Sequence, residues 1–171
     1  MMNSRKQQAI FDGWLREHAA ILHHVANGFA TGADRHDLMQ ELMLALWRAV
    51  PAFRAASLAS TFIFRVTHNA ALTWMRAERS YRRRLDTFQQ QHGSPDLPAG
   101  AGLDASTDLL ELLYSAIHTL EPIDRSLLLL QLDGASYAQI AEIHGLSESN
   151  VGVRLNRIKH KLTSIVQEKQ S

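Results

Sequence analysis

Apolar residues recur at intervals of three, four and seven positions along most of this 171-residue sequence. That spacing places side chains on one face of an α-helix. The chain holds only 4 prolines, so long helices are permitted over most of its length. Apolar residue types make up 46% of the sequence, which is enough for a buried core. The pattern therefore predicts an all-α protein.

Three amphipathic helices are predicted in the first half of the chain. Asp34 is placed to cap the second helix, and Pro51 ends it because the residue before a proline is pushed out of helical geometry. The third helix is expected to run from about Ser60 to Arg79. Apolar residues are expected on the buried face of each helix. They are Ile10, Trp14, Ile21, Leu22 and Val25 in the first helix, Leu38, Leu42, Leu46 and Trp47 in the second, and Phe62, Val66, Ala70 and Trp74 in the third.

A segment of different composition follows the third helix. The stretch "RLDTFQQQHGSPDLPAGAGLDAS", from Arg84 to Ser106, is rich in glutamine, glycine, proline and alanine and shows little apolar periodicity. Such a composition is typical of a flexible linker between domains. Four further helices are expected after it. We therefore predict two small helical domains, residues 1–84 and 107–171, joined by a linker at 85–106.

The stretch "SYAQIAEIHGLSESNVGVRLNRIKHKL" reads as two short helices joined by a tight turn. Ser136 and Gln139 fit a capping box, Gly145 can end the first helix in the left-handed conformation, and Ser147 can cap the second. Ala141, Gly145 and Val151 have the spacing of a helix-turn-helix. A solvated helical hairpin is the alternative. The outward residues predicted to contact DNA are Ser149, Asn150, Val153, Asn156, Arg157 and Lys161.

Charge and cysteine content narrow the function further. The net charge is only +1, which is low for a protein that holds DNA unaided, so any DNA contact must be local. A second basic cluster, "RAERSYRRR", lies at the end of the third helix, where it can track phosphates or simply be solvated. No cysteine is present, which excludes disulfides and thiolate metal sites. Without an apolar run of about 20 residues, we expect a soluble cytoplasmic protein with no membrane insertion.

Two blocks of the sequence resemble a known family. The block "DLMQELMLALWRAVPAFRAASLASTFIFRVTHNAALTWMR" is similar to region 2 of the bacterial sigma-70 superfamily, in its small extracytoplasmic-function branch. The block "LEPIDRSLLLLQLDGASYAQIAEIHGLSESNVGVRLNRIKHKL" is similar to region 4 of the same branch. Both blocks occur in the expected order, with a linker between them. The resemblance implies a sigma factor that directs RNA polymerase to promoters and catalyses no reaction itself.

The resemblance implies a division of labour between the blocks. Core RNA polymerase would dock on the second helix, at Asp37, Gln40, Glu41, Leu42 and Trp47. The minus-ten promoter element would be read by Arg54, Ser57, Ser60, Thr61, Phe62, Arg65, Asn69 and Arg76. The minus-thirty-five element would meet the outward residues of the helix-turn-helix. Besides polymerase and promoter DNA, the family implies a third partner class, an anti-sigma protein that folds the two modules together. The family usually has tryptophan where Phe62 stands and glycine where Ala55 stands.

Two other functions were weighed. A stand-alone helix-turn-helix regulator would explain the second half of the chain but leaves the region-2-like half without a task. A metal-dependent enzyme is suggested by nine histidines. However, they are scattered, and none forms an i, i+4 pair around a glutamate. The sequence therefore implies no cofactor and no metal.

Overall fold

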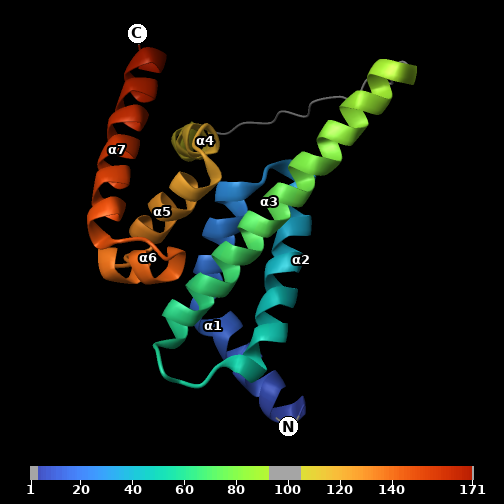
Figure 1. Cartoon of the computed structure of the whole chain (residues 1–171), viewed down its shortest axis with the longest axis vertical. Coiled ribbons are helices and arrows are strands. Elements are labelled where there is room, and N and C mark those ends of the chain that lie inside the picture. The colour runs from blue at the N-terminus through green and yellow to red at the C-terminus, as the bar shows by residue number, and fades with distance from the viewer. Residues whose placement is uncertain (1–3, 93–104, 171) are drawn as a thin grey trace.

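The computed structural model describes residues 4–92 and 105–170, which are almost entirely helical (Figure 1). The elements in chain order are α1 (Ser4–Phe29), α2 (Gly32–Ala49), the 3-10 turn η1 (Val50–Ala52), α3 (Ala59–His92), α4 (Ala105–His118), α5 (Pro122–Leu132), α6 (Tyr137–His144) and α7 (Glu148–Gln170). The prediction of an all-α protein is confirmed for these residues.

The N-terminal half packs α1, α2 and α3 along one another. Leu38, Leu42 and Leu46 of α2 have no exposed surface and form the centre of this half. The helix ends at Ala49, as predicted, and Pro51 lies in the following 3-10 turn. The expected reason is wrong, however, because Val50, the residue before the proline, keeps right-handed helical angles (φ −48°, ψ −45°). The helical geometry of α1 is interrupted once, at His18 (φ −127°, ψ 18°).

Helix α3 is longer than the sequence pattern suggests. It ends at His92, whereas we predicted an end near Arg79 and a linker from residue 85. Residues 84–92 are mostly arginine, leucine and glutamine, which are good helix formers, and the next glycine is at position 93. The predicted linker therefore begins inside a helix. Its remainder, 93–104, lies outside the described residues, and the domain boundaries stay a prediction.

The buried face of α3 also differs from the prediction. Phe62, Val66, Ala70 and Trp74, expected to share the buried side, are only half-buried and pack at its edge. The buried α3 residues are Thr61, Ile63, Phe64, Thr67, His68, Ala71 and Leu72. The reason is that α3 lies between α1 and α2 on one side and α5 and α6 on the other. A helix covered on two sides has a wider buried face than the amphipathic stripe of a surface helix.

The C-terminal half contains the predicted helix-turn-helix in α6 and α7. The capping box is present, because the backbone N–H of Gln139 donates to Ser136 Oγ (3.2 Å) and that of Ser136 donates to Gln139 Oε1 (2.9 Å). Gly145 ends α6 with a left-handed φ of 65°. Ala141 and Val151 are buried where the two helices cross.

The two halves pack directly against each other, and their buried apolar residues form one continuous cluster. We define the interface between the halves as the surface where α1 and α3 meet α4, α5 and α6 (Figure 1). Gly28 lies at this crossing: a Cβ on it would stand 2.3 Å from Leu129 Cδ1. Only a residue without a side chain allows α1 and α5 to approach so closely.

Candidate nucleic-acid and polymerase interfaces

The predicted minus-thirty-five surface forms one open face of α7. All six predicted residues are exposed, and the apolar Val153 remains 57% exposed. Val151, Leu155 and Ile158 point the opposite way, into the core of the C-terminal half. Polar side chains and one arginine therefore stand clear of the protein along one helix face, as a helix that enters a major groove requires. The residues on this face are Ser149, Asn150, Val153, Asn156, Arg157 and Lys161.

The start of α7 is fixed by local contacts. Ser147 Oγ accepts a hydrogen bond from the backbone N–H of Asn150 (3.1 Å), which confirms the predicted cap. At the other end of the face, Lys161 Nζ reaches the carbonyl of Thr119 at 3.4 Å. Gly152 lies against Tyr137, whose Cε2 would be 3.4 Å from an added Cβ. These contacts hold the recognition face at a fixed angle to α6.

The predicted minus-ten surface begins in the loop before α3. Arg54 and Ser57 are exposed there. Ala55 has a φ of 54°, and it is the one non-glycine residue with positive φ among those described. This is the position where the family usually carries glycine, which adopts that conformation without steric cost.

Two residues of the predicted minus-ten surface are contacted by α6. Thr61 is only 5% exposed, and its Oγ1 accepts a hydrogen bond from Gln139 Nε2 (3.2 Å). Arg65 Nη2 pairs with Glu142 Oε1 at 2.5 Å. In the packed arrangement, Thr61 is therefore covered by the other half of the chain, whereas the side chain of Arg65 is paired with that half and remains 40% exposed.

The remaining predicted minus-ten residues differ in how far their side chains are exposed to solvent. Phe62 is half-buried, with its ring 5.7 Å from that of Trp14 and 5.2 Å from that of Phe53. It belongs to an aromatic cluster at the edge of the N-terminal core. Asn69 and Arg76 are exposed farther along α3, and Ser60 is half-buried.

The predicted polymerase surface on α2 separates into two kinds of residue. Asp37, Gln40 and Glu41 are exposed, whereas Leu42 is completely buried. Trp47 is half-buried and packs edge-to-face on Phe11, with ring centroids 5.4 Å apart. The exposed carboxylates and amide are therefore the groups available to a partner, and Leu42 supports them from the core.

A chain of hydrogen bonds crosses the interface between the halves. His68 of α3 is fully buried, and its Nδ1 lies 2.6 Å from Ser126 Oγ of α5. The same hydroxyl lies 2.8 Å from His144 Nε2 of α6. Burial, and then the nearby His144, lower the pKa of His68 to about 3, so its imidazole is neutral in the packed form.

Arg125, which directly precedes Ser126 in α5, also ties the halves together. Its side chain is 4% exposed and lies over the ring of Phe29, 5.6 Å from the centroid. The guanidinium donates to the carbonyls of Gly28 (3.4 Å), His118 (2.7 Å) and Leu120 (3.1 Å). These carbonyls belong to the ends of α1 and α4, where unpaired carbonyls attract a cation.

The sequence analysis did not single out Arg125, His68, Ser126 or Gly28. Four of the histidines weighed as metal ligands contact the other half, namely His24, His68, His118 and His144. Within 4–92 and 105–170, no three histidine or acidic side chains lie close enough to hold a metal ion. In the same ranges, no helix is both long and apolar enough to cross a bilayer.

Comparisons with known proteins agree with this arrangement, in which a three-helix half precedes a half that contains a helix-turn-helix. Residues 14–81 match the family described as sigma-70 region 2, and residues 110–162 match sigma-70 region 4. Together the two matches span more than half of the chain. The chain belongs to the sigma-70 superfamily. The curated relatives that it matches are extracytoplasmic-function (ECF) sigma factors. Below, region 2 denotes the N-terminal half and region 4 the C-terminal half.

Curated relatives and solved structures support this membership. The ECF RNA polymerase sigma-E factor of Escherichia coli (strain K12) is 24% identical over 147 residues, covering 81% of this chain and 77% of the relative. The sigma-E factor of Haemophilus influenzae is 25% identical over 144 residues, covering 78% and 75%. The sigma factor RpoE of Bartonella quintana, solved with the anti-sigma factor NepR, shares the fold with a TM-score of 0.69 at 21% sequence identity. The match covers 92% of this chain and 96% of RpoE. CnrH, solved with the cytosolic domain of CnrY, shares the fold with a TM-score of 0.67 at 20% sequence identity. The match covers 94% of this chain and 90% of CnrH.

Proposed function

We propose that this chain is a cytoplasmic promoter-specificity subunit of RNA polymerase that carries no catalytic activity of its own. The observation that carries the proposal is the presence of both sigma regions in order, with an open recognition face on α7 and exposed acids on α2. Region 2 would dock on core polymerase and read the minus-ten element, and region 4 would read the minus-thirty-five element. The polymerase supplies the chemistry.

Reading the minus-ten element requires the halves to separate. Thr61 is covered by α6 in the packed arrangement, so DNA reaches it only after region 4 moves away, and the same movement releases Arg65 from Glu142. We propose that docking on core polymerase supplies the free energy for this opening. A partner shifts such an equilibrium only if it binds the open form more tightly.

The proposal is tested by reconstitution with core RNA polymerase. The chain should co-purify with the core enzyme and direct initiation at defined start sites in a purified transcription reaction. Specific duplex binding by the free chain with no polymerase dependence would instead support a stand-alone regulator. Failure of both assays would contradict the proposal.

The division of labour is tested by charge-matched variants. Arg157→Ala should weaken promoter binding by about tenfold and leave polymerase docking intact, whereas Lys159→Ala on the opposite side of α7 should change neither. Asp37→Ala with Glu41→Ala should weaken docking but not DNA contact. The matched control removes two exposed acids of α1, Asp12 and Glu17. Equal loss of polymerase binding in both test variants would show that the surfaces are wrongly assigned.

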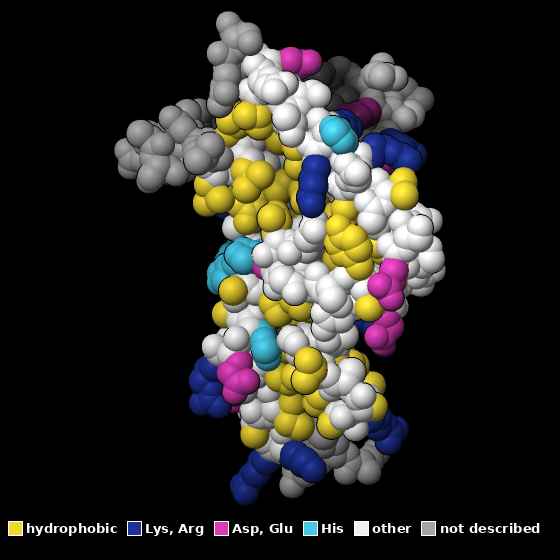
Figure 2. All heavy atoms as spheres, turned by 90° about the vertical axis from the view of Figure 1, so that its left-hand side faces the viewer, with side chains coloured by type: hydrophobic (Ala, Val, Ile, Leu, Met, Phe, Trp, Pro, Cys, Tyr) yellow, Lys and Arg dark blue, Asp and Glu magenta, His cyan; other side chains and the backbone are white. Residues whose placement is uncertain are grey.

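We extend the proposal to an anti-sigma partner. One of the two solved structures contains a named anti-sigma factor, and the other holds a second protein on the same fold. Region 4 also exposes an apolar groove of about 380 Å³ between α4 and α7, and Figure 2 shows hydrophobic side chains gathered on this face. A purified protein that binds this chain and suppresses its transcription in the reconstituted reaction would support the extension, and binding without suppression would contradict it.

A further inference from the structure

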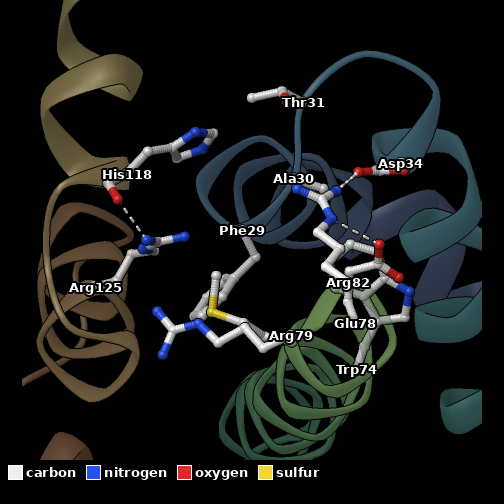
Figure 3. A pocket seen from close by; sticks show the side chains of 11 residues that line it. Phe29, Ala30, Thr31, Asp34, Trp74, Glu78, Arg79, Arg82, His118 and Arg125 are labelled. Atoms are coloured by element: carbon white, nitrogen blue, oxygen red, sulfur yellow. Dashed lines mark hydrogen bonds and ion pairs between the residues drawn. The ribbon is translucent and has the colours of Figure 1, made fainter. Parts of the chain in front are cut away.

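A pocket of about 220 Å³ opens where the two regions meet (Figure 3). It is lined by the turn between α1 and α2, by α3, and by α4 and α5. Its three arginines and one histidine come from three elements: Arg79 and Arg82 from α3, His118 from α4 and Arg125 from α5. Part of the basic segment found in the sequence therefore faces a cavity.

The charges in this pocket are not balanced. Both of its acids engage the same arginine: Glu78 Oε1 lies 2.9 Å from Arg82 Nε, and Asp34 pairs with Arg82 Nη2. Figure 3 shows this compensated group on one side and Arg79, Arg125 and His118 on the other. Within the described ranges, no carboxylate lies within ion-pair distance of Arg79 or Arg125, although the charge of Glu121 acts on Arg125 from farther away.

The unpaired cations also repel one another. Burial, and then the charge of Arg79, lower the pKa of Arg125 to about 10, against a smaller opposite effect of the Glu121 carboxylate. Burial lowers the pKa of His118, and the charge of Arg125 adds to this effect. The three carbonyls accept hydrogen bonds from Nη1 and Nη2 of Arg125, and its buried Nε has no hydrogen-bond partner among the described residues. Like charges held together beside a cavity favour a bound counter-anion.

We propose that this pocket binds a phosphate-type oxyanion between Arg79 of region 2 and Arg125 and His118 of region 4. Guanidinium groups match the geometry of phosphate oxygens and hold them through paired N–H donors. His118 Nε2 donates to the carbonyl of Asn27 at 2.8 Å, which leaves Nδ1 for the anion once the ring is protonated. The cavity has room for phosphate or pyrophosphate.

Such an anion binds only the packed arrangement, because its ligands come from both regions. It therefore stabilises the closed chain by mass action. This step rests on the structure alone. Its regulatory consequence, that the anion opposes promoter recognition, rests on the proposed function.

The binding step is tested on the full chain by thermal unfolding and calorimetry with inorganic phosphate, pyrophosphate and ATP, each against sodium chloride of equal ionic strength. Phosphate should raise Tm by about 2–4 °C well above its Kd, and pyrophosphate should act at lower concentration. Stabilisation by ATP at still lower concentration would assign the phosphate groups to a nucleotide. Arg79→Ala should abolish the shift. Arg83→Ala, which removes the same charge from another exposed position on α3 that does not line the pocket, should retain it.

Two outcomes would overturn the site: no anion stabilises the chain beyond the salt control, or both variants lose the shift equally. The regulatory step is tested separately in the reconstituted reaction. Phosphate should reduce initiation by the wild type more than by Arg79→Ala at equal ionic strength. If phosphate binds but inhibits the wild type and Arg79→Ala equally, the regulatory step alone is refuted. If the chain directs no initiation at all, the proposed function is refuted, and the binding result is unaffected.

Discussion

Region 4 carries its predicted DNA contacts on an open helix face, whereas region 2 has one of its own, Thr61, beneath the other half of the chain and another, Arg65, paired with it. Val153 is 57% exposed on α7, but Thr61 at the start of α3 is 5% exposed. The same short helix, α6, explains both facts, because it supports α7 on one side and covers α3 on the other.

The difference shows that the two surfaces are not equally available in the free chain. Under the proposed function, region 4 would meet DNA as it stands, whereas region 2 would first lose its contacts with Gln139 and Glu142. The interface between the halves would therefore control when both surfaces act together. The changes below follow in order of decreasing expected effect: the first three weaken that interface, and the last alters the region 2 loop outside it.

The largest effect is expected at Arg125. Arg125→Ala leaves three helix-end carbonyls without their donor and removes the contact with Phe29. Urea unfolding followed by circular dichroism should show a loss of about 3 kcal/mol in the free energy of unfolding. The exposed Arg83→Ala should change it by less than about 0.5 kcal/mol. Equal stability of the two variants would remove Arg125 from the interface.

The close approach of α1 to α5 is tested by two glycines of the same helix. Gly28→Ala places a Cβ against the buried Leu129, which should cost about 2 kcal/mol through overpacking. Gly13→Ala meets no atom within 4 Å and should gain up to about 1 kcal/mol from helix propensity. The measurement is the Tm of each variant. A rise in both would mean that the halves do not pack as described.

Acidification should weaken the interface through His68. The folded-state pKa of about 3 lies below the ordinary 6.5, so the stability contributed by neutral His68 is complete above pH 6.5 and is lost as the pH falls toward 3. Between pH 6.5 and 5.5 the free energy of unfolding should fall by about 1 kcal/mol. The lowered pKa values of His118 and His144 act in the same direction. His68→Asn should flatten the pH profile, and an unchanged slope would contradict this account.

The smallest effect is expected in the loop of region 2, away from the interface. Ala55→Gly relieves the left-handed strain at φ 54° and should stabilise the chain by about 0.5–1 kcal/mol. The neighbouring Ala56→Gly, which has no positive φ to relieve, should give no gain. Thermal unfolding would measure both variants. A loss of stability in Ala55→Gly would show that the loop is not strained.

Local features were predictable from the sequence. Ser136 with Gln139, Gly145 and Ser147 act through neighbours within four residues, so their spacing alone indicates the caps and the turn. The end of α2 next to Pro51 was predictable as well, although not for the expected reason. The recognition face of α7 then follows from helical periodicity, because the buried residues fix which residues point outward.

The interface between the halves was not predictable in this way. His68 and Gly28 acquire their roles from residues on α5 and α6 that lie far away in the sequence. Arg125 reads as a surface cation until the ends of two helices surround it. The wider buried face of α3 has the same origin, because an amphipathic pattern shows only one packing partner.

The most direct test measures the distance between the halves. The chain contains no cysteine, so Glu17→Cys on α1 and Glu168→Cys on α7, both exposed, provide two unique sites for a fluorescence energy-transfer pair. The account predicts one compact population in the free chain and a longer distance once core polymerase and promoter DNA are added. An unchanged distance in a complex that initiates transcription would contradict it.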